Sequence, residues 1–247
     1  MLTGKNILVT GANRGIGKAI LQKCAENHAN VWAVVRKTDS EMLEYWTELE
    51  KQYHIWICPI EIDMQDEQSV LEGAKAVLTR KEPVWGIVNN AGITGENRLF
   101  AMTTQDELRK VFQVNFFSPM LLTQRLLRNM MKNRQGSIVK IASVAALDGE
   151  PAQFAYVTSK ASMVGAVKKL SSELAGMGIR VNAVAPGMTD TGMMDQMQDD
   201  LKQKSLSSVA MKRLAEPEEI ADTVLFLLSE NSSFITGQVI RVDGGKI

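Results

Sequence analysis

Three side chains in the middle of this sequence could act together on one carbonyl or alcohol oxygen. Tyr156 and Lys160 stand four positions apart in a predicted helix, so they share one of its faces. A phenol exchanges protons poorly at neutral pH, and a nearby ammonium favours the phenolate and lowers its pKa. Ser143 follows a predicted strand and could hydrogen-bond the same oxygen. Because a solvated lysine beside a half-buried tyrosine is common in helices, this interpretation depends on the rest of the sequence.

A glycine-rich segment near the N-terminus is typical of a phosphate-binding loop. A buried strand over 5–10 precedes Gly11, Gly15 and Gly17, and an amphipathic helix follows. Glycines let the backbone approach a pyrophosphate closely, and the first helical turn offers free N–H groups. The spacing is Gly-x-x-x-Gly-x-Gly, which differs from the Gly-x-Gly-x-x-Gly of the general dinucleotide fingerprint. The alternative is a glycine-rich turn that binds no ligand.

Predicted strands and helices alternate along the chain. Further strands are expected at 30–35, 55–62, 84–89, 137–142, 180–185 and 238–242, with helices at 15–27, 40–53, 66–81, 104–133, 154–177 and 217–229. This alternation predicts a single domain over 1–247, a Rossmann-type doubly wound α/β fold with about seven parallel strands. In such sheets ligands bind beyond the carboxyl ends of the strands. The residues at those ends are Gly11, Asp63, Asn89, Ser143 and Pro186.

Composition excludes several classes of function. The 28 basic and 28 acidic residues balance, which argues against a nucleic-acid or membrane-surface partner. No stretch approaches the roughly 20 apolar residues of a membrane span, and the first strand leaves no room for a signal peptide. Cys24 and Cys58 are expected to be reduced and packed, and with only two histidines a metal site is not expected. A cytoplasmic protein is therefore predicted.

Several motifs, taken in order, resemble those of the short-chain dehydrogenase/reductase family. They are Thr-Gly-x-x-x-Gly-x-Gly at 10–17, Asn89-Asn90-Ala91-Gly92, Asn115, Ser143, Tyr156-x-x-x-Lys160 and Pro186-Gly187. Within the family the sequence is most similar to the reductases of 3-oxoacyl thioesters on acyl carrier protein. The likeness extends to Pro217–Ala221 and to residues 235–245. The motifs are highly specific for the family and much less specific for the substrate.

The resemblance implies catalytic and cofactor-binding roles. Tyr156 would give a proton to the substrate carbonyl as hydride arrives from the nicotinamide, while Ser143 orients that oxygen. Lys160 would hold the nicotinamide ribose and lower the tyrosine pKa, and Asn115 would support a water-linked proton relay. Besides Tyr156 and Lys160, cofactor contacts are expected from Gly11, Asn13, Arg14, Gly15, Ile16, Gly17, Arg36, Asp63, Met64, Asn90, Ala91, Gly92, Pro186, Gly187, Thr189 and Thr191.

Two arginines favour NADP(H) over NAD(H) as the cofactor. An NAD-preferring site usually has an acid at the end of the second strand, where this chain has Arg36. Together with Arg14, it could bind the 2′-phosphate through the planar guanidinium fork. Alternatively Arg36 belongs to a solvated rim, with Asp39 or Ser40 capping the next helix. Asp63 resembles a contact to the adenine amino group, or it is only a turn residue.

The substrate is less well determined. A substrate lid is expected at 187–215, where Met188, Met193, Met194, Met197 and Met211 could accommodate an acyl chain or could simply fill gaps. An acyl carrier protein is a possible partner. Arg134 matches one basic docking position of the carrier reductases, but Met177 replaces a second. Asp148 and Glu150 also add acids just before Tyr156. The alternatives are another small ketone or alcohol, such as a sugar or steroid, or a non-catalytic NADP-binding regulator.

The helix predicted over 154–177 has apolar residues on more than one face. Packing on a single sheet needs only one apolar stripe, so the surplus predicts burial against a second chain. In the family this helix and the one over 104–133 pair across a two-fold axis. A homo-oligomer, either a dimer or a tetramer, is therefore expected.

Overall fold

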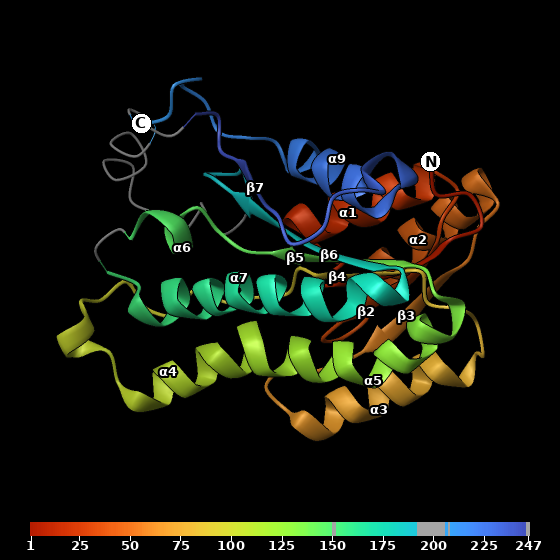
Figure 1. The fold of residues 1–247 in the computed structure, drawn as a ribbon, viewed down its shortest axis with the longest axis horizontal. Helices are drawn as coiled ribbons and strands as arrows, with labels where there is room; N and C mark the ends of the chain where they lie inside the picture. Colours follow the sequence, from red (N-terminus) through yellow and green to blue (C-terminus); the bar gives the residue numbers. More distant parts are fainter. Residues whose placement is uncertain (150–151, 192–205, 207, 246–247) are drawn as a thin grey trace.

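The computed structural model describes residues 1–149, 152–191, 206 and 208–245. Seven parallel strands form one sheet in the order β3-β2-β1-β4-β5-β6-β7 (Figure 1). Their bounds are Asn6–Thr10 (β1), Asn30–Val35 (β2), Ile57–Glu61 (β3), Gly86–Asn89 (β4), Gly136–Ile141 (β5), Ile179–Pro186 (β6) and Val239–Val242 (β7). The strand order reverses between β1 and β4. The predicted Rossmann-type fold is confirmed.

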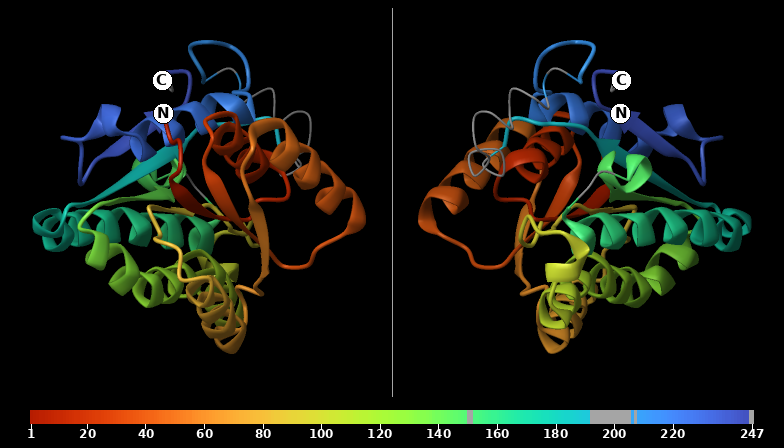
Figure 2. Two further views of the ribbon diagram at one scale, coloured as in Figure 1. Left: turned by 90° about the vertical axis from the view of Figure 1, so that its right-hand side faces the viewer. Right: turned by 90° about the vertical axis from the view of Figure 1, so that its left-hand side faces the viewer.

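Helices cover both faces of this sheet (Figure 2). One face carries Gly15–Glu26 (α1), Ser40–Tyr53 (α2) and Pro217–Leu228 (α9). The other carries Glu67–Thr79 (α3), Ser118–Asn133 (α5) and Phe154–Leu174 (α7), with Gln105–Phe112 (α4) packed against α7. A short helix, Ala145–Asp148 (α6), lies between β5 and α7. No helix within the described ranges is long and apolar enough to cross a lipid bilayer.

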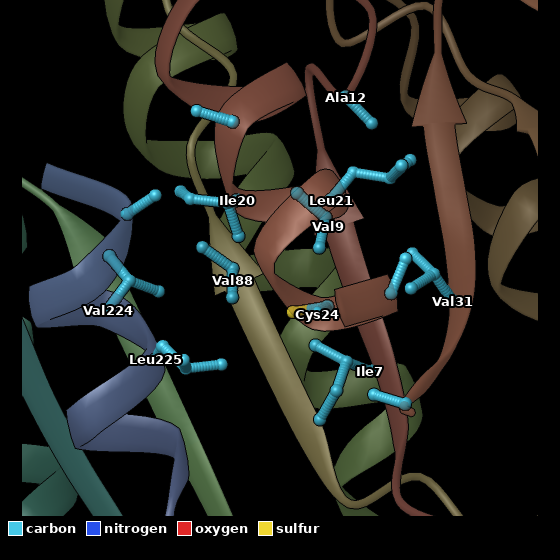
Figure 3. Packing of buried hydrophobic residues seen from close by; sticks show 14 of the residues in the cluster. Ile7, Val9, Ala12, Ile20, Leu21, Cys24, Val31, Val88, Val224 and Leu225 are labelled. Carbon is cyan, nitrogen blue, oxygen red and sulfur yellow. The ribbon is translucent and has the colours of Figure 1, made fainter. Parts of the chain in front are cut away.

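The core between α1, α9 and the sheet shows why the strands contain apolar runs. Figure 3 shows Ile20 and Cys24 of α1 and Val224 of α9 lying over Val9 and Val88 of the central strands. All five residues of β1 are buried. A parallel sheet covered on both faces requires apolar side chains on both, which the sequence supplies as near-continuous runs rather than strict alternation.

The largest departure from the predicted elements is in the helix expected over 104–133. It is divided into α4, a π-helical segment Gln113–Phe117 (η2), and α5. Such π segments commonly occur at functional sites, and this one contains Asn115. The Asn115 side chain is buried and bonded to other segments, so tertiary contacts accompany the altered helical register.

Candidate active site

The turn from β1 into α1 is built so that only glycine fits. Gly11 and Gly15 have φ of 67° and 50°, in the left-handed region that side chains avoid. A Cβ on Gly17 would lie 1.9 Å from the Gly11 carbonyl oxygen and 2.5 Å from Asn90 Nδ2. The chain therefore turns tightly here, directly before the N-terminus of α1.

Two features of this helix N-terminus favour an anion. Arg14 stands at the N-cap without a side-chain capping bond, and the first turn has no acidic residue. Its unsatisfied N–H groups and positive dipole end favour a negatively charged ligand. Thr191 lies against this turn, because a Cβ on Gly15 would be 3.1 Å from the Thr191 Cγ2 atom. The predicted contacts at 11–17 and at Thr191 therefore come together.

Thr10 joins this loop to the segment that follows β4. Its Oγ1 accepts the backbone N–H groups of Asn90 and Ala91 at 2.9 and 3.0 Å. Asn90 Nδ2 in turn donates to the Thr10 carbonyl at 2.9 Å. This role of the Thr10 side chain was not predicted from the motif. A polar residue at the end of a fully buried strand was the available signal.

Arg14 and Arg36 are exposed, and neither forms a salt bridge with any described residue. Asp39 caps α2 by accepting the Met42 N–H at 2.9 Å, as the alternative interpretation of this strand end expected. Asp63 accepts the Gln65 N–H at 2.8 Å, so it does serve as a turn residue. Its expected contact with adenine remains a prediction.

The remaining predicted cofactor residues lie on loops after the strands or close to them. Asn13 is exposed and Ile16 is half-buried, whereas Met64 and Thr189 are buried. Met64 accepts the Ser118 hydroxyl at 2.7 Å through its carbonyl oxygen. Gly187, directly after Pro186, donates its N–H to Val242 O at 2.9 Å.

Ser143 and Tyr156 meet, as the motif spacing predicted. Ser143 follows β5 and is buried, and its Oγ accepts the Ala145 N–H at 3.2 Å. Burial raises the pKa of Tyr156, and the hydrogen bond with Ser143 partly opposes that rise. The pKa of Tyr156 is therefore raised, in contrast to the expected lowering by Lys160. The physical reason is that burial disfavours the phenolate.

Lys160 points into the protein rather than to solvent. Its Nζ donates to the Ile141 carbonyl at 2.7 Å and lies 5.9 Å from the centroid of the Tyr156 ring. Burial lowers the pKa of Lys160 to about 8. An amine that is easily deprotonated is a weaker source of positive potential for the tyrosine.

Asn115 fixes the loop beside this lysine. Its Oδ1 accepts the Ile93 N–H at 2.8 Å, and its Nδ2 donates to the Ile93 carbonyl and to Ser159 Oγ, both at 2.9 Å. A Cβ on Gly92 would lie 3.2 Å from Asn115 Oδ1 and 3.3 Å from Lys160 Nζ. The structure thus brings Asn115, Gly92 and Lys160 together from segments far apart in the sequence.

A second buried lysine lies beneath these loops and was not foreseen. Lys140 of β5 is fully buried, and its Nζ donates to Asn89 Oδ1 at 2.9 Å across the β4–β5 pairing. Asn89 Oδ1 also accepts the Thr123 hydroxyl at 3.3 Å. No carboxylate within the described ranges pairs with Lys140, and burial lowers its pKa to about 7. This side chain joins the ends of the strands that lead to Asn90 and Ser143.

Aromatic side chains flank the start of α7. Phe100, from the short segment Phe100–Met102 (η1), packs against Phe154 of α7 with ring centroids 4.5 Å apart. Phe154 precedes Tyr156 by two residues, and Phe100 is 66% exposed. Leu99 and Met102 beside it are also exposed. Leu99, Phe100 and Met102 therefore form an exposed apolar patch at the start of α7.

The acids noted before Tyr156 have different outcomes. Asp148 is held by Arg241 through two hydrogen bonds of 2.6 and 3.0 Å, so its charge is compensated. Glu150 lies outside the described residues. Of the methionines in the expected lid, Met193, Met194 and Met197 also lie outside the described residues, whereas Met211 is 66% exposed.

The two positions considered for docking a carrier protein are also defined. Arg134 is exposed at the end of α5, where its Nη2 donates to the Gly176 carbonyl at 3.3 Å. Met177 is half-buried and packs against the core on the α5 and α7 side of the sheet. The Arg134 guanidinium is therefore partly engaged by the backbone, and Met177 contributes packing but no charge.

Comparison with known proteins gives the class of this protein. A family model described as enoyl-(acyl carrier protein) reductase matches residues 11–246. The chain belongs to the short-chain dehydrogenase/reductase family, and it is an oxidoreductase acting on CH–OH groups with a nicotinamide cofactor.

Individual relatives are similar over their whole length. The chain is 38% identical to 3-oxoacyl-[acyl-carrier-protein] reductase of Aquifex aeolicus, over 99% of this chain and 98% of that protein. It is 37% identical to the protein of the same name from Thermotoga maritima, over 100% and 99%. The crystal structure of 3-oxoacyl-[acyl-carrier protein] reductase from Brucella melitensis is 32% identical, with a TM-score of 0.90, over 99% of this chain and 92% of that one.

Proposed function

We propose that this protein reduces a 3-oxoacyl thioester to the 3-hydroxyacyl form, with NADPH as the hydride donor. The observation that carries this proposal is the meeting of the Ser143 hydroxyl and the Tyr156 phenol at the carboxyl end of the sheet. Two neighbouring O–H groups suit a developing alkoxide, which is what hydride addition to a carbonyl produces. The names of the similar reductases support the choice of a 3-oxoacyl substrate.

The raised pKa of Tyr156 suits proton donation during reduction. A phenol that stays protonated at neutral pH has a proton to give to the substrate oxygen, and Ser143 orients that oxygen by a hydrogen bond. The bound cofactor supplies the hydride. Lys160, close to Gly92, would hold the nicotinamide ribose hydroxyls through its ammonium. Asn115 would keep the loop carrying Gly92 in place.

The choice of NADPH rests on unpaired positive charge beside the phosphate loop. Arg14 and Arg36 have no acidic partner among the described residues, so both guanidinium groups are available to a 2′-phosphate. The N-terminus of α1 would receive the pyrophosphate, and the Gly17 contact with Gly11 allows the close approach.

An apolar acyl chain and a second copy of the protein complete the proposal. Phe100 and Phe154 offer an apolar surface at the start of α7 for the acyl chain. Val157, Val164 and Leu170 of α7 remain partly exposed after the helix has packed on its sheet. These exposed apolar side chains support the proposed homo-oligomer. The free thiols of Cys24 and Cys58 agree with the proposed cytoplasmic location.

A substrate panel tests the proposed function. Oxidation of NADPH is followed by absorbance with an acetoacetyl thioester, a sugar and a steroid ketone, and each reaction is repeated with NADH. We expect the thioester to be reduced fastest and NADPH to be preferred. Faster reduction of the sugar or steroid would assign the same site to another ketone. Binding of NADPH without reduction of any panel member would favour the non-catalytic regulator.

A further inference from the structure

The helices α3 and α5 lie side by side (Figure 1). A groove of about 1470 Å³ runs between them. Its walls are formed by residues 71–79 of α3 and 124–133 of α5, and residues 81 and 83 close one end. At 1.5 Å per residue each wall is about 12–15 Å long, which matches about two to three turns of a helix. None of the candidate active-site residues lines this groove.

Five cations line the α3/α5 groove. They are Lys75, Lys81, Arg125, Arg128 and Lys132, all exposed, and no aspartate or glutamate lines it with them. The chain as a whole has 28 basic and 28 acidic residues, so this is a local concentration of positive charge.

These five cations also lack partners. Within the described part of the chain none of them forms an ion pair, a ring contact or a side-chain hydrogen bond. Cations elsewhere usually have one, as with Lys23 on Asp222 and Arg80 over the Trp56 ring. Arg14 and Arg36, which we assign to a phosphate, share this lack of a partner. Lys51 and Lys110 also lack partners but lie apart from each other, so the α3/α5 groove is the largest cluster of unpaired cations in the described part of the chain.

The α3 wall of this groove is largely apolar, and the uncharged polar residues Thr79, Gln124, Asn129 and Asn133 also line the groove. Leu71, Ala74 and Leu78 of α3 lie along it, with Pro83 at one end, and Leu78 is 37% exposed. An apolar wall beside cations complements an amphipathic helix whose apolar stripe is flanked by acids. Duplex nucleic acid would satisfy the cations but would leave the apolar surface without a partner, so these features favour a protein.

We infer that the α3/α5 groove docks an acidic amphipathic helix of a partner protein. The identity of this partner rests on the proposed function: it is the acidic protein that carries the substrate. The cations of α5, from Arg125 to Lys132, lie ten to 17 residues beyond Asn115, which is about 15–25 Å along the helical segment. A docked carrier must therefore hold its substrate on a tether at least that long. Arg134, the docking residue expected from the sequence, is instead engaged by Gly176.

Binding of a fluorescently labelled acyl carrier protein tests this inference by anisotropy. The double variant Lys75→Glu/Lys132→Glu reverses one charge on each wall of the groove. Its matched control is Lys51→Glu/Lys110→Glu, which makes the same change in net charge at two other exposed lysines without partners. We expect at least about tenfold weaker binding for the groove variant, less than about twofold for the control, and a steep loss of wild-type binding with salt.

Reduction of a free 3-oxoacyl thioester by each variant shows that the site is intact, and we expect wild-type rates. Equal weakening by both double variants, or by neither, would overturn the docking inference. Tighter binding of duplex DNA than of carrier protein at the groove would also overturn it. Groove-dependent carrier binding without any thioester reduction would support docking and reject the proposed function. Thioester reduction with groove-independent carrier binding would reject docking alone.

Discussion

Replacing the buried Lys140 by methionine should stabilise the protein at neutral pH. Methionine is unbranched like lysine, so it can fill much of the same space. The Met120 sulfur, 3.7 Å from Lys140 Nζ, would then be its neighbour. Moving the lysine pKa from 10.5 to about 7 corresponds to about 5 kcal/mol of unfavourable burial. Loss of the hydrogen bond to Asn89 offsets about 1–3 kcal/mol of this. The expected gain is therefore about 2–4 kcal/mol at pH 7.

The pH dependence of this gain has a definite sign. Between pH 7 and 10.5 the unfolded chain holds the proton of Lys140 more tightly than the folded chain does, so wild-type stability rises with pH. The burial cost is fully present below about pH 7 and disappears above about 10.5. The advantage of Lys140→Met should follow it, largest at pH 7 and fading as the pH approaches 10.

Urea unfolding of both proteins at fixed concentration, from pH 6 to 10, measures this difference. Other titrating groups, including Lys160, largely cancel between wild type and variant. Lys169→Met, at a surface position, is the control and should show no comparable trend. The reasoning fails if Lys140→Met is less stable than wild type at pH 7, or if its advantage is the same at pH 7 and pH 10.

Three further changes test the cofactor site. Gly17→Ala forces a Cβ to within 1.9 Å of the Gly11 carbonyl, so it should weaken NADPH binding and lower the free energy of unfolding by about 1–3 kcal/mol; calorimetry and urea unfolding measure both, and unchanged values would contradict the close approach. Arg36→Ala should weaken NADPH binding by about tenfold or more while sparing NADH, and equal losses for both cofactors would count against a 2′-phosphate contact. Lys160→Ala should weaken NADPH binding and lower kcat together; a loss confined to one of them would show that the ammonium does not serve both ribose and tyrosine.

Local sequence signals predicted the regular elements closely. The helix expected over 40–53 has those bounds, because Asp39 caps its first turn. The glycine positions also predicted the tight turn between β1 and α1, since a positive φ and a close approach are properties of single residues.

Features that depend on contacts between distant segments were not predictable in the same way. The π segment around Asn115 involves bonds to Ile93 and Ser159, from other parts of the chain. Lys140 is polar in a strand whose neighbours are apolar, and only the folded sheet shows that it is fully buried. The rise in the Tyr156 pKa follows from burial, which the motif spacing does not specify.

The most direct test of the central claim is the turnover of Tyr156→Phe with a 3-oxoacyl thioester and NADPH. Phenylalanine keeps the aromatic packing and removes the O–H group that meets Ser143. We predict that kcat falls by about 100-fold or more, while the dissociation constant for NADPH, measured by fluorescence titration, stays unchanged. Near-wild-type turnover by Tyr156→Phe on a substrate that the wild type reduces would contradict proton donation by this tyrosine.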